Sequence, residues 1–373
     1  MTTHQTSQTL LRGAAQLLAG IPYLLDYRPE RSLVLVGSVV ERARLAREAR
    51  PRLPVSVLLR VDLPAAGEAD SLAAQLAAPV GRVVRDRGQG LVDPLLLVHL
   101  FLLDATDDEA TALLAECREH LAPAGAELHS VLLVRDGLFR SLLPQECPPD
   151  CDTDEHRCPT GWQPVPDPAD VPGVADLVLE GRNPSRRRED VVARVRARDE
   201  RSAGLTTVAL GVLDLDPSRL DRLEAVGVLG RWVCGGGQLP DPRERAAIAR
   251  TTEDRWVRDL LLGRWLPDVF PLAGLQLTPE DRRLLGALPP LPTETGDCVE
   301  RLLDLAGAVP APLTPALLTL VGCLAWRHGE GTVANEAIDL ALEVDPDYRM
   351  AQLLQRVLVH GISPWAMRTA AAA

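Results

Sequence analysis

The stretch Pro94–Leu103 reads P-L-L-L-V-H-L-F-L-L and is apolar at every position except His99. A short run that is apolar on both faces is typical of a strand in the middle of a sheet, covered from both sides. Strand-like runs also occupy Arg31–Val40, Val55–Leu63 and Glu127–Val134. The sequence therefore predicts a sheet built around Pro94–Leu103.

Segments with apolar residues at helical spacing alternate with these strands. They are Thr9–Ala19, Ser71–Val84 and Thr106–Leu121. Gly20 and Pro22 are expected to end the first of them, because proline removes a helical hydrogen bond and crowds the preceding turn.

Two local patterns sharpen this picture. Thr106 followed by Glu109 is a capping box, which marks the start of a helix. Asp136-Gly137 is a two-residue hairpin signal that leads into Leu138–Leu143. Residues 1–145 are therefore predicted to form an α/β domain with a mixed sheet and helices on its faces.

Three aspartates follow strand runs and make the sheet's carboxyl edge a candidate site: Asp62, Asp104 and Asp136. Ligands gather beyond the carboxyl ends of parallel strands, and clustered carboxylates could hold Mg²⁺. Each aspartate also has a local explanation. Asp104 precedes a capped helix, Asp136 belongs to a turn, and Asp62 lies at the opposite edge if its strand is antiparallel.

The histidines of the predicted sheet favour structural roles. His99 on its apolar strand is interpreted as a hydrogen-bonded core histidine rather than a general base. His129 and Ser130 are adjacent on a strand, so we expect them on opposite faces, which excludes them by themselves as a nucleophile–base pair.

A cysteine-bearing loop follows the predicted sheet and supplies four candidate metal ligands: Cys147, Cys151, His156 and Cys158. Three thiolates and an imidazole suit tetrahedral Zn²⁺, and a closed set of four is typical of a structural site. The loop lacks paired C-x₂-C knuckles, and the single residue between His156 and Cys158 is cramped. A surface or redox-sensitive loop and a catalytic cysteine remain alternatives.

The rest of the chain is predicted to be helical. Residues 146–172 form a Cys/Pro-rich junction that includes the extended connector Trp162–Pro172, and residues 173–373 form a helical domain. Helices are predicted over Ala175–Leu179, Arg186–Arg198 and Arg243–Trp265, and Leu205–Leu213 is an apolar run.

Near the end of the chain, Leu318, Val321, Gly322 and Ala325 are followed by a second group, namely Ala334, Ile338, Ala341 and Pro346. This pattern resembles a tetratricopeptide repeat. The resemblance implies a helical hairpin, and such repeats mostly bind peptides or proteins. One clear unit is present, and Leu318, Ala325 and Ile338 stand where aromatic residues are usual.

The run Leu17–Val36 (L-L-A-G-I-P-Y-L-L-D-Y-R-P-E-R-S-L-V-L-V), followed by Arg60–Pro64 (R-V-D-L-P), resembles an uncharacterised family of domains of unknown function. That family is common in GC-rich Gram-positive bacteria. The resemblance covers most of the chain and implies a shared fold but no activity. Its recurring residues here are Pro22, Pro29, Ser32, Asp62 and Pro64.

Composition excludes several chemistries. The sequence contains no lysine, so all 40 basic residues are arginine, and it holds no P-loop lysine, Schiff-base lysine or Ser–Lys pair. The net charge of −12 and an aromatic content of 3% argue against nucleic-acid binding, which needs a basic footprint and stacking platforms.

The sequence predicts no membrane helix and no signal peptide, so we expect a cytoplasmic protein with reduced thiols. No catalytic or cofactor-binding residue is assigned. Our first hypothesis is a non-catalytic interaction or adaptor protein whose helical half contacts a protein partner or a second copy. The alternatives are a small-ligand-binding protein or enzyme at the sheet's carboxyl edge, and a nucleic-acid-associated protein.

Overall fold

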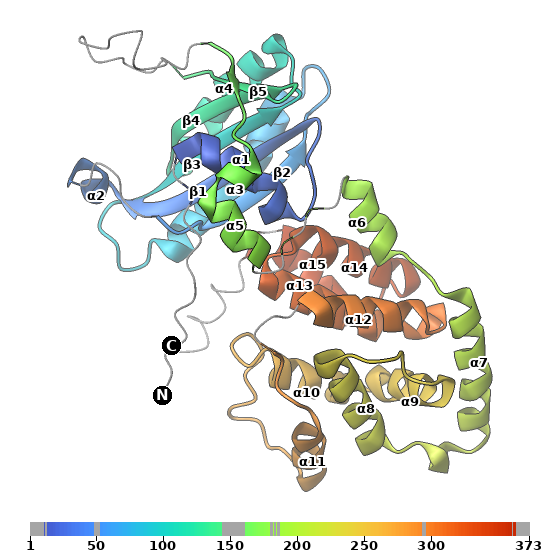
Figure 1. The fold of residues 1–373 in the computed structure, drawn as a ribbon. Helices are drawn as coiled ribbons and strands as arrows, with labels where there is room; N and C mark the ends of the chain where they lie inside the picture. Colours follow the sequence, from blue (N-terminus) through green and yellow to red (C-terminus); the bar gives the residue numbers. More distant parts are fainter. Residues whose placement is uncertain are drawn as a thin grey trace. The chain divides into compact units, whose positions relative to one another are not determined.

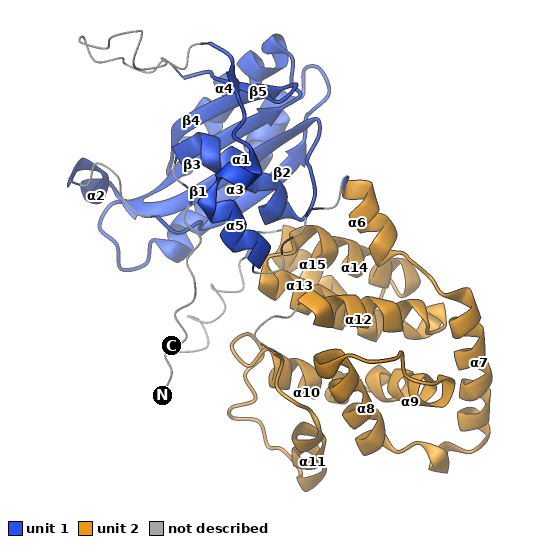
Figure 2. Ribbon diagram, viewed as in Figure 1, with its two compact units in different colours: residues 1–187, 360–362 blue, residues 188–359, 363–373 orange. Residues whose placement is uncertain are grey.

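The computed structural model describes residues 11, 13–47, 53–143, 161–179, 182, 184, 187–292, 296–359 and 361–362 (Figure 1). The chain divides into two compact units (Figure 2). Unit 1 comprises residues 1–187 with 360–362, and unit 2 comprises residues 188–359 with 363–373. The predicted class is confirmed, since an α/β unit with a mixed sheet precedes an all-helical unit.

The described residues of unit 1 form one six-stranded sheet with the order β2-β1-β3-β4-β5-β6. Only β3 and β4 run parallel, and the other neighbouring strands are antiparallel. The strands are β1 (Ser32–Glu41), β2 (Val57–Asp62), β3 (Pro94–Leu103), β4 (Ala126–Arg135), β5 (Leu138–Ser141) and β6 (Gln163–Pro164).

Strand β3 is central, as its apolar sequence predicts, and both of its faces are buried. Leu96, Val98, Leu100 and Leu102 pack in a core with α3 (Ala69–Arg87) and α4 (Asp107–Leu121). Phe101 and Leu103 pack in a second core with α1 (Gly13–Leu25) on the other face. The sheet is therefore sandwiched between helices, with α5 (Pro172–Leu179) packed on α1.

Helix α1 departs from the prediction that Gly20 and Pro22 would end it. It continues through Pro22 to Leu25. Ile21 is fully buried, and Leu24 and Leu25 pack against the sheet. Burial of these side chains offsets the hydrogen bond that proline removes.

Helix α4 begins as predicted. The Thr106 hydroxyl accepts from the Glu109 N–H at 3.2 Å, and the Glu109 carboxylate accepts from the Thr106 N–H at 2.7 Å.

The predicted extended connector contributes an element that the sequence did not reveal. Gln163–Pro164 pairs with β5 as the edge strand β6.

Unit 2 is organised around α13 (Pro315–His328), in which every residue from Pro315 to Trp326 is buried. The predicted hairpin is formed by α13 and α14 (Gly331–Val344), and α15 (Arg349–Val359) packs against both helices. The preceding helices are α6 (Arg188–Val195), α7 (Glu200–Leu215), α8 (Arg222–Gly235), α9 (Pro242–Glu253), α10 (Arg255–Trp265), α11 (Pro279–Ala287) and α12 (Gly296–Gly307).

The single long helix predicted over Arg243–Trp265 is wrong, because the chain breaks at Asp254. That residue is extended, with ψ of 111°, and its side chain accepts from the Trp256 N–H at 3.0 Å. Asp254 therefore caps α10, since a short acidic side chain competes with the helical backbone for hydrogen bonds.

The close contact at Gly322 yields a stability prediction. A Cβ at Gly322 would meet the Ile338 side chain at 2.7 Å, whereas a Cβ at Gly286 in α11 meets open space. We expect Gly322→Leu to lower the free energy of unfolding by about 1–3 kcal/mol through overpacking. Gly286→Leu, the matched control, should raise it by about 0.5–1 kcal/mol through helix propensity. Equal effects in chemical denaturation would contradict close packing of α13 on α14.

Candidate functional site

The sheet brings all three predicted aspartates to one edge, since Leu103 also pairs with Val134 of the parallel strand β4, just before Asp136. Both β2 and β3 run antiparallel to β1, and Ser32 of β1 pairs with Asp62 on one side and with Leu103 on the other. Asp62 and Asp104 therefore lie at the same edge of the sheet, and β2 does not end at the opposite edge.

Arginine side chains pair with the carboxylates at this edge. Arg60 contacts Asp62 at 2.6 Å and donates to the Ser32 hydroxyl at 2.9 Å. The Arg31 N–H donates to the Asp104 carboxylate at 3.3 Å, and its guanidinium donates to the Asp104 carbonyl at 2.8 Å. The same guanidinium makes a bidentate pair with Glu109 at 2.8 and 3.0 Å. That pair holds the pKa of Glu109 at about 2, with the Thr106 N–H as the next contribution.

A second arginine group lies at the end of β4. Arg135 and Arg140 both contact the Asp107 carboxylate, and both guanidinium groups lie over the Trp162 ring at 5.5 and 5.2 Å. The hydrogen bond from Arg135 lowers the pKa of Asp107. Asp136 takes a left-handed conformation, with φ of 50°, in the turn between β4 and β5. Along this edge, arginine guanidinium groups and carboxylates form ion pairs that neutralise one another's charges.

His99 is a hydrogen-bonded core residue, as predicted, but its surroundings were not foreseen. A bulge in β4 lets Ser130 pair with His99, and the Ser130 hydroxyl lies 2.7 Å from the His99 Nδ1. The ring of His129 also contacts His99 edge-on, with centroids 5.3 Å apart. His129 and Ser130 therefore both reach His99, so the expectation that they point to opposite faces is wrong. The reason is that a bulge interrupts the strand's alternation.

Burial first, and then the neighbouring His129, lower the pKa of His99 to about 4. His99 is therefore neutral at pH 7. The neighbour of this imidazole is a second imidazole rather than a carboxylate that would stabilise a protonated base. The Ser130–His99 contact is thus explained by satisfying a half-buried polar side chain.

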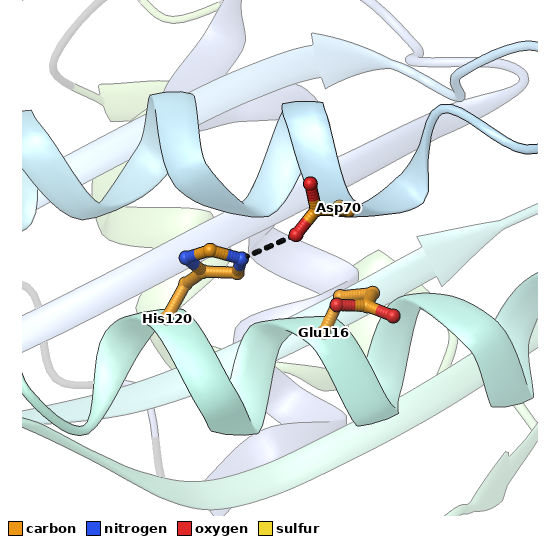
Figure 3. A group of neighbouring side chains, drawn as sticks. All are labelled: Asp70, Glu116 and His120. Atoms are coloured by element: carbon orange, nitrogen blue, oxygen red, sulfur yellow. Dashed lines mark hydrogen bonds and ion pairs between the residues drawn. The ribbon is translucent and has the colours of Figure 1, made fainter.

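A group of metal-ligating side chains joins α3 to α4 in unit 1. Glu116 and His120 are one turn apart on α4, and Asp70 lies in the first turn of α3 (Figure 3). The His120 Nε2 lies 2.7 Å from the Asp70 carboxylate, and one ligand atom from each residue lies within 4.8 Å of the others. Asp70 is largely exposed, so the contact is first of all a surface hydrogen bond between two packed helices.

The most unusual surface in the described part of unit 2 belongs to α7. Asp199 caps the helix by accepting from the Ser202 N–H at 3.0 Å. The inner side is fixed by the buried Arg245 of α9, which donates to the Thr206 hydroxyl at 2.9 Å and the Ser202 carbonyl at 3.1 Å. Ala203 and Leu210 are buried on the same side.

The outer side of α7 is also apolar. Leu205, Val208, Val212 and Leu215 follow one another at three-, four- and three-residue steps, so they form one stripe along the helix. They are 50%, 71%, 44% and 89% exposed. We call these four residues the α7 stripe. A helix that is apolar all round is normally buried, so a covering surface is expected.

Two glycines lie beside the α7 stripe, and neither is required by its surroundings. A Cβ built at Gly204 or Gly211 meets nothing within 4 Å, and both residues are exposed. Glycine inside a helix costs about 1 kcal/mol relative to alanine. A close approach by another backbone would use this absence of side chains.

The hollows of unit 2 are small. One of about 170 Å³ lies between the segment Val195–Arg198 and helices α12–α14. Its arginines are engaged, since Arg198 donates to the carbonyls of Ala306 and Val309, and Arg196 pairs with Glu336 and Glu343. Another of about 300 Å³ is lined by Trp256 and Asp281, among others. Small-molecule sites span roughly 300–1,000 Å³, so the first hollow falls below this range and the second lies at its lower limit.

The predicted zinc ligands Cys147, Cys151, His156 and Cys158 lie outside the described residues. No helix in the described part of the chain combines the length and apolar character that crossing a bilayer requires. Neither the zinc site nor a cytoplasmic location is tested by these findings, and both stay predictions.

Comparison with known proteins identifies a family. A family described as a domain of unknown function (DUF4192) matches residues 15–365. No curated protein matches the chain, and no solved structure matches it either.

The depressed pKa of His99 predicts a pH dependence of stability. The unfolded chain binds a proton near pH 6.5, whereas folded His99 does so only near pH 4. The contribution is therefore complete above about pH 6.5 and is lost as the pH falls through about 4. We expect the unfolding free energy to rise by at most about 3 kcal/mol more in the natural chain than in His99→Gln across this range. Parallel pH profiles in urea titrations would contradict a buried neutral His99.

The zinc prediction is checked by elemental analysis of the full chain purified without chelator. We expect about one zinc per chain, lost in Cys158→Ser because three remaining ligands leave a tetrahedral site open. His120→Ala is the matched control, since it removes a ligand from the α3–α4 group and should leave the content unchanged. Zinc well below one per chain, unaffected by Cys158→Ser, would end the prediction.

Proposed function

Since the chain belongs to the family described as a domain of unknown function (DUF4192), we propose its function from its surface. The protein is a non-catalytic interaction or adaptor protein that binds another polypeptide through α7 of its helical unit. It acts in the cytoplasm. The observation that carries the proposal is the α7 stripe, four large apolar side chains in a row on a helix whose opposite side is already packed.

The unfavourable exposure of the α7 stripe to water supports this proposal. Exposed apolar side chains scattered singly are ordinary, but a contiguous stripe is a surface that water solvates poorly. Full burial of each leucine or valine side chain contributes about 1.5–3 kcal/mol. Because Arg245 and the Asp199 cap hold α7 in place, the stripe is presented on a rigid helix rather than on a loop. A preorganised helix loses little conformational entropy on binding.

Catalysis at the sheet's carboxyl edge is less well supported. The carboxylates of Asp62, Glu109 and Asp107 already accept from arginines. A site that binds a charged substrate needs charged side chains that can turn toward the substrate. Here Arg60, Arg31 and Arg135 each already have one of these carboxylates as a partner. The edge is explained by neutralisation between neighbouring loops.

Nucleic-acid binding through the arginine-rich segment around α6 is also less well supported. Arg194 contacts Glu300 at 2.8 Å, and Arg196 contacts Glu343 at 2.6 Å. The Arg198 guanidinium donates to two backbone carbonyls. These arginines hold helices of unit 2 together, which reduces the positive charge available to a phosphate backbone.

The proposal is tested by quantitative capture from cells that naturally express the protein. Tagged full-length chains carry no change, Val208→Arg, or Val92→Arg. Val92 is the matched control, because it is 75% exposed in unit 1, against 71% for Val208. We expect at least one protein, identified by mass spectrometry, to be retained by the unchanged and Val92→Arg chains and reduced about tenfold or more by Val208→Arg.

Equal capture by all three chains, with each confirmed as folded by circular dichroism, would contradict binding through α7. Capture that changes only with Val92→Arg would move the contact surface to unit 1.

A further inference from the structure

We infer that the surface covering the α7 stripe is α7 of a second copy of this chain, packed antiparallel across a two-fold axis at the level of Leu210. The inference rests on the proposed function and names its partner. In such a pair the same patch is used by both copies, so its residues must complement themselves.

The spacing of the α7 stripe has this self-complementarity. Leu205 and Leu215 lie five residues on either side of Leu210, and Val208 and Val212 lie two residues on either side. In an antiparallel helix pair centred there, Leu205 faces Leu215 of the second copy and Val208 faces Val212 of the second copy. Each leucine thus meets a leucine at the ends, and each valine meets a valine beside the axis.

The glycines beside the stripe fit the same arrangement. Gly211 lies next to the level of the axis, where the two helices come closest, and Gly204 lies about two turns toward the amino end, beside Leu205. A side chain at either position would enter the space that the second helix occupies, whereas in the single chain that space is open. The absence of a side chain is therefore useful only if another backbone approaches.

Helix dipoles and the repulsion expected in a parallel pair favour the antiparallel direction. Glu200 and Arg201 are exposed at the amino end, and Asp216 and Arg219 lie beyond the carboxyl end, held together at 2.9 Å. In the antiparallel pair centred at Leu210, Arg201 lies level with Arg219 of the second copy, whose charge Asp216 already offsets. A parallel pair would set Arg201 beside its own counterpart, and like charges repel. Antiparallel helix dipoles also attract.

The oligomeric state of the full chain is measured by sedimentation equilibrium over a wide concentration range. We expect a monomer–dimer equilibrium that Val92→Arg leaves unchanged. Val208→Arg should raise the dissociation constant at least about 100-fold, because the change occurs twice beside the axis. Gly211→Ala gives a second readout. It should weaken the dimer, although alanine favours the helix of the isolated chain.

The direction of packing is tested by disulfide cross-linking of Leu205→Cys and Leu215→Cys chains carrying different tags. An antiparallel pair links one variant to the other in a mixture. It does not link either variant to itself, because like positions lie about 15 Å apart along the axis. The parent chain, treated identically, gives the background from its natural cysteines.

Three results would overturn the inference. They are a monomer at every concentration, a dimer that Val208→Arg leaves unchanged, and cross-links that join each variant to itself. The first result is separable from failure of the proposed function. If the chain is monomeric but Val208→Arg still abolishes capture of another protein, the partner is that protein and the proposed function stands. If capture is also unaffected, both fail.

Discussion

An element that is apolar on both sides has to be covered on both sides, and this constraint orders the molecule. Strand β3 meets it with α3 and α4 on one face of the sheet and α1 on the other. Helix α13 meets it by lying within unit 2, where its residues from Pro315 to Trp326 are buried. Helix α7 is apolar on both sides as well, yet its inner side alone is covered within unit 2. The uncovered side of α7 is therefore expected to be covered by a surface outside the single chain.

The exclusive use of arginine shapes the polar contacts. A guanidinium offers five donors in a fixed plane, so one side chain can join several carbonyls or a carboxylate and a carbonyl together. Arg245 joins α9 to α7 in this way, and Arg258 of α10 donates to Asp259 and to the Tyr348 hydroxyl before α15. The same chemistry at the sheet edge links Arg31 to Asp104 and Glu109. Many arginines are therefore structural ties, which is why an arginine-rich sequence need not bind anions.

Local patterns were reliable where a residue's role depends on its near neighbours. The Thr106–Glu109 capping box and the two-sided burial of β3 follow from side chains a few positions apart, and the structure confirms both. The errors arose where distant packing or a single backbone irregularity decides the outcome. Pro22 is retained inside α1 because the buried face around Ile21 outweighs one hydrogen bond, and Asp254 divides a long apolar pattern by capping α10. The contact of His129 and Ser130 with His99 needs a bulge that no spacing rule announces.

The sequence by itself determined the fold class, a mixed sheet with helices followed by an all-helical region, because the period of apolar residues changes from strand-like to helical along the chain. It also determined the excluded lysine chemistry, since a missing side chain cannot be supplied by folding. Only the tertiary structure decided that Asp62 and Asp104 share an edge and that Asp70 meets Glu116 and His120. It alone decided which side of the apolar run Leu205–Leu213 stays exposed. Such facts depend on which distant segments pack together, and a run of apolar residues does not say which of its sides finds a neighbour.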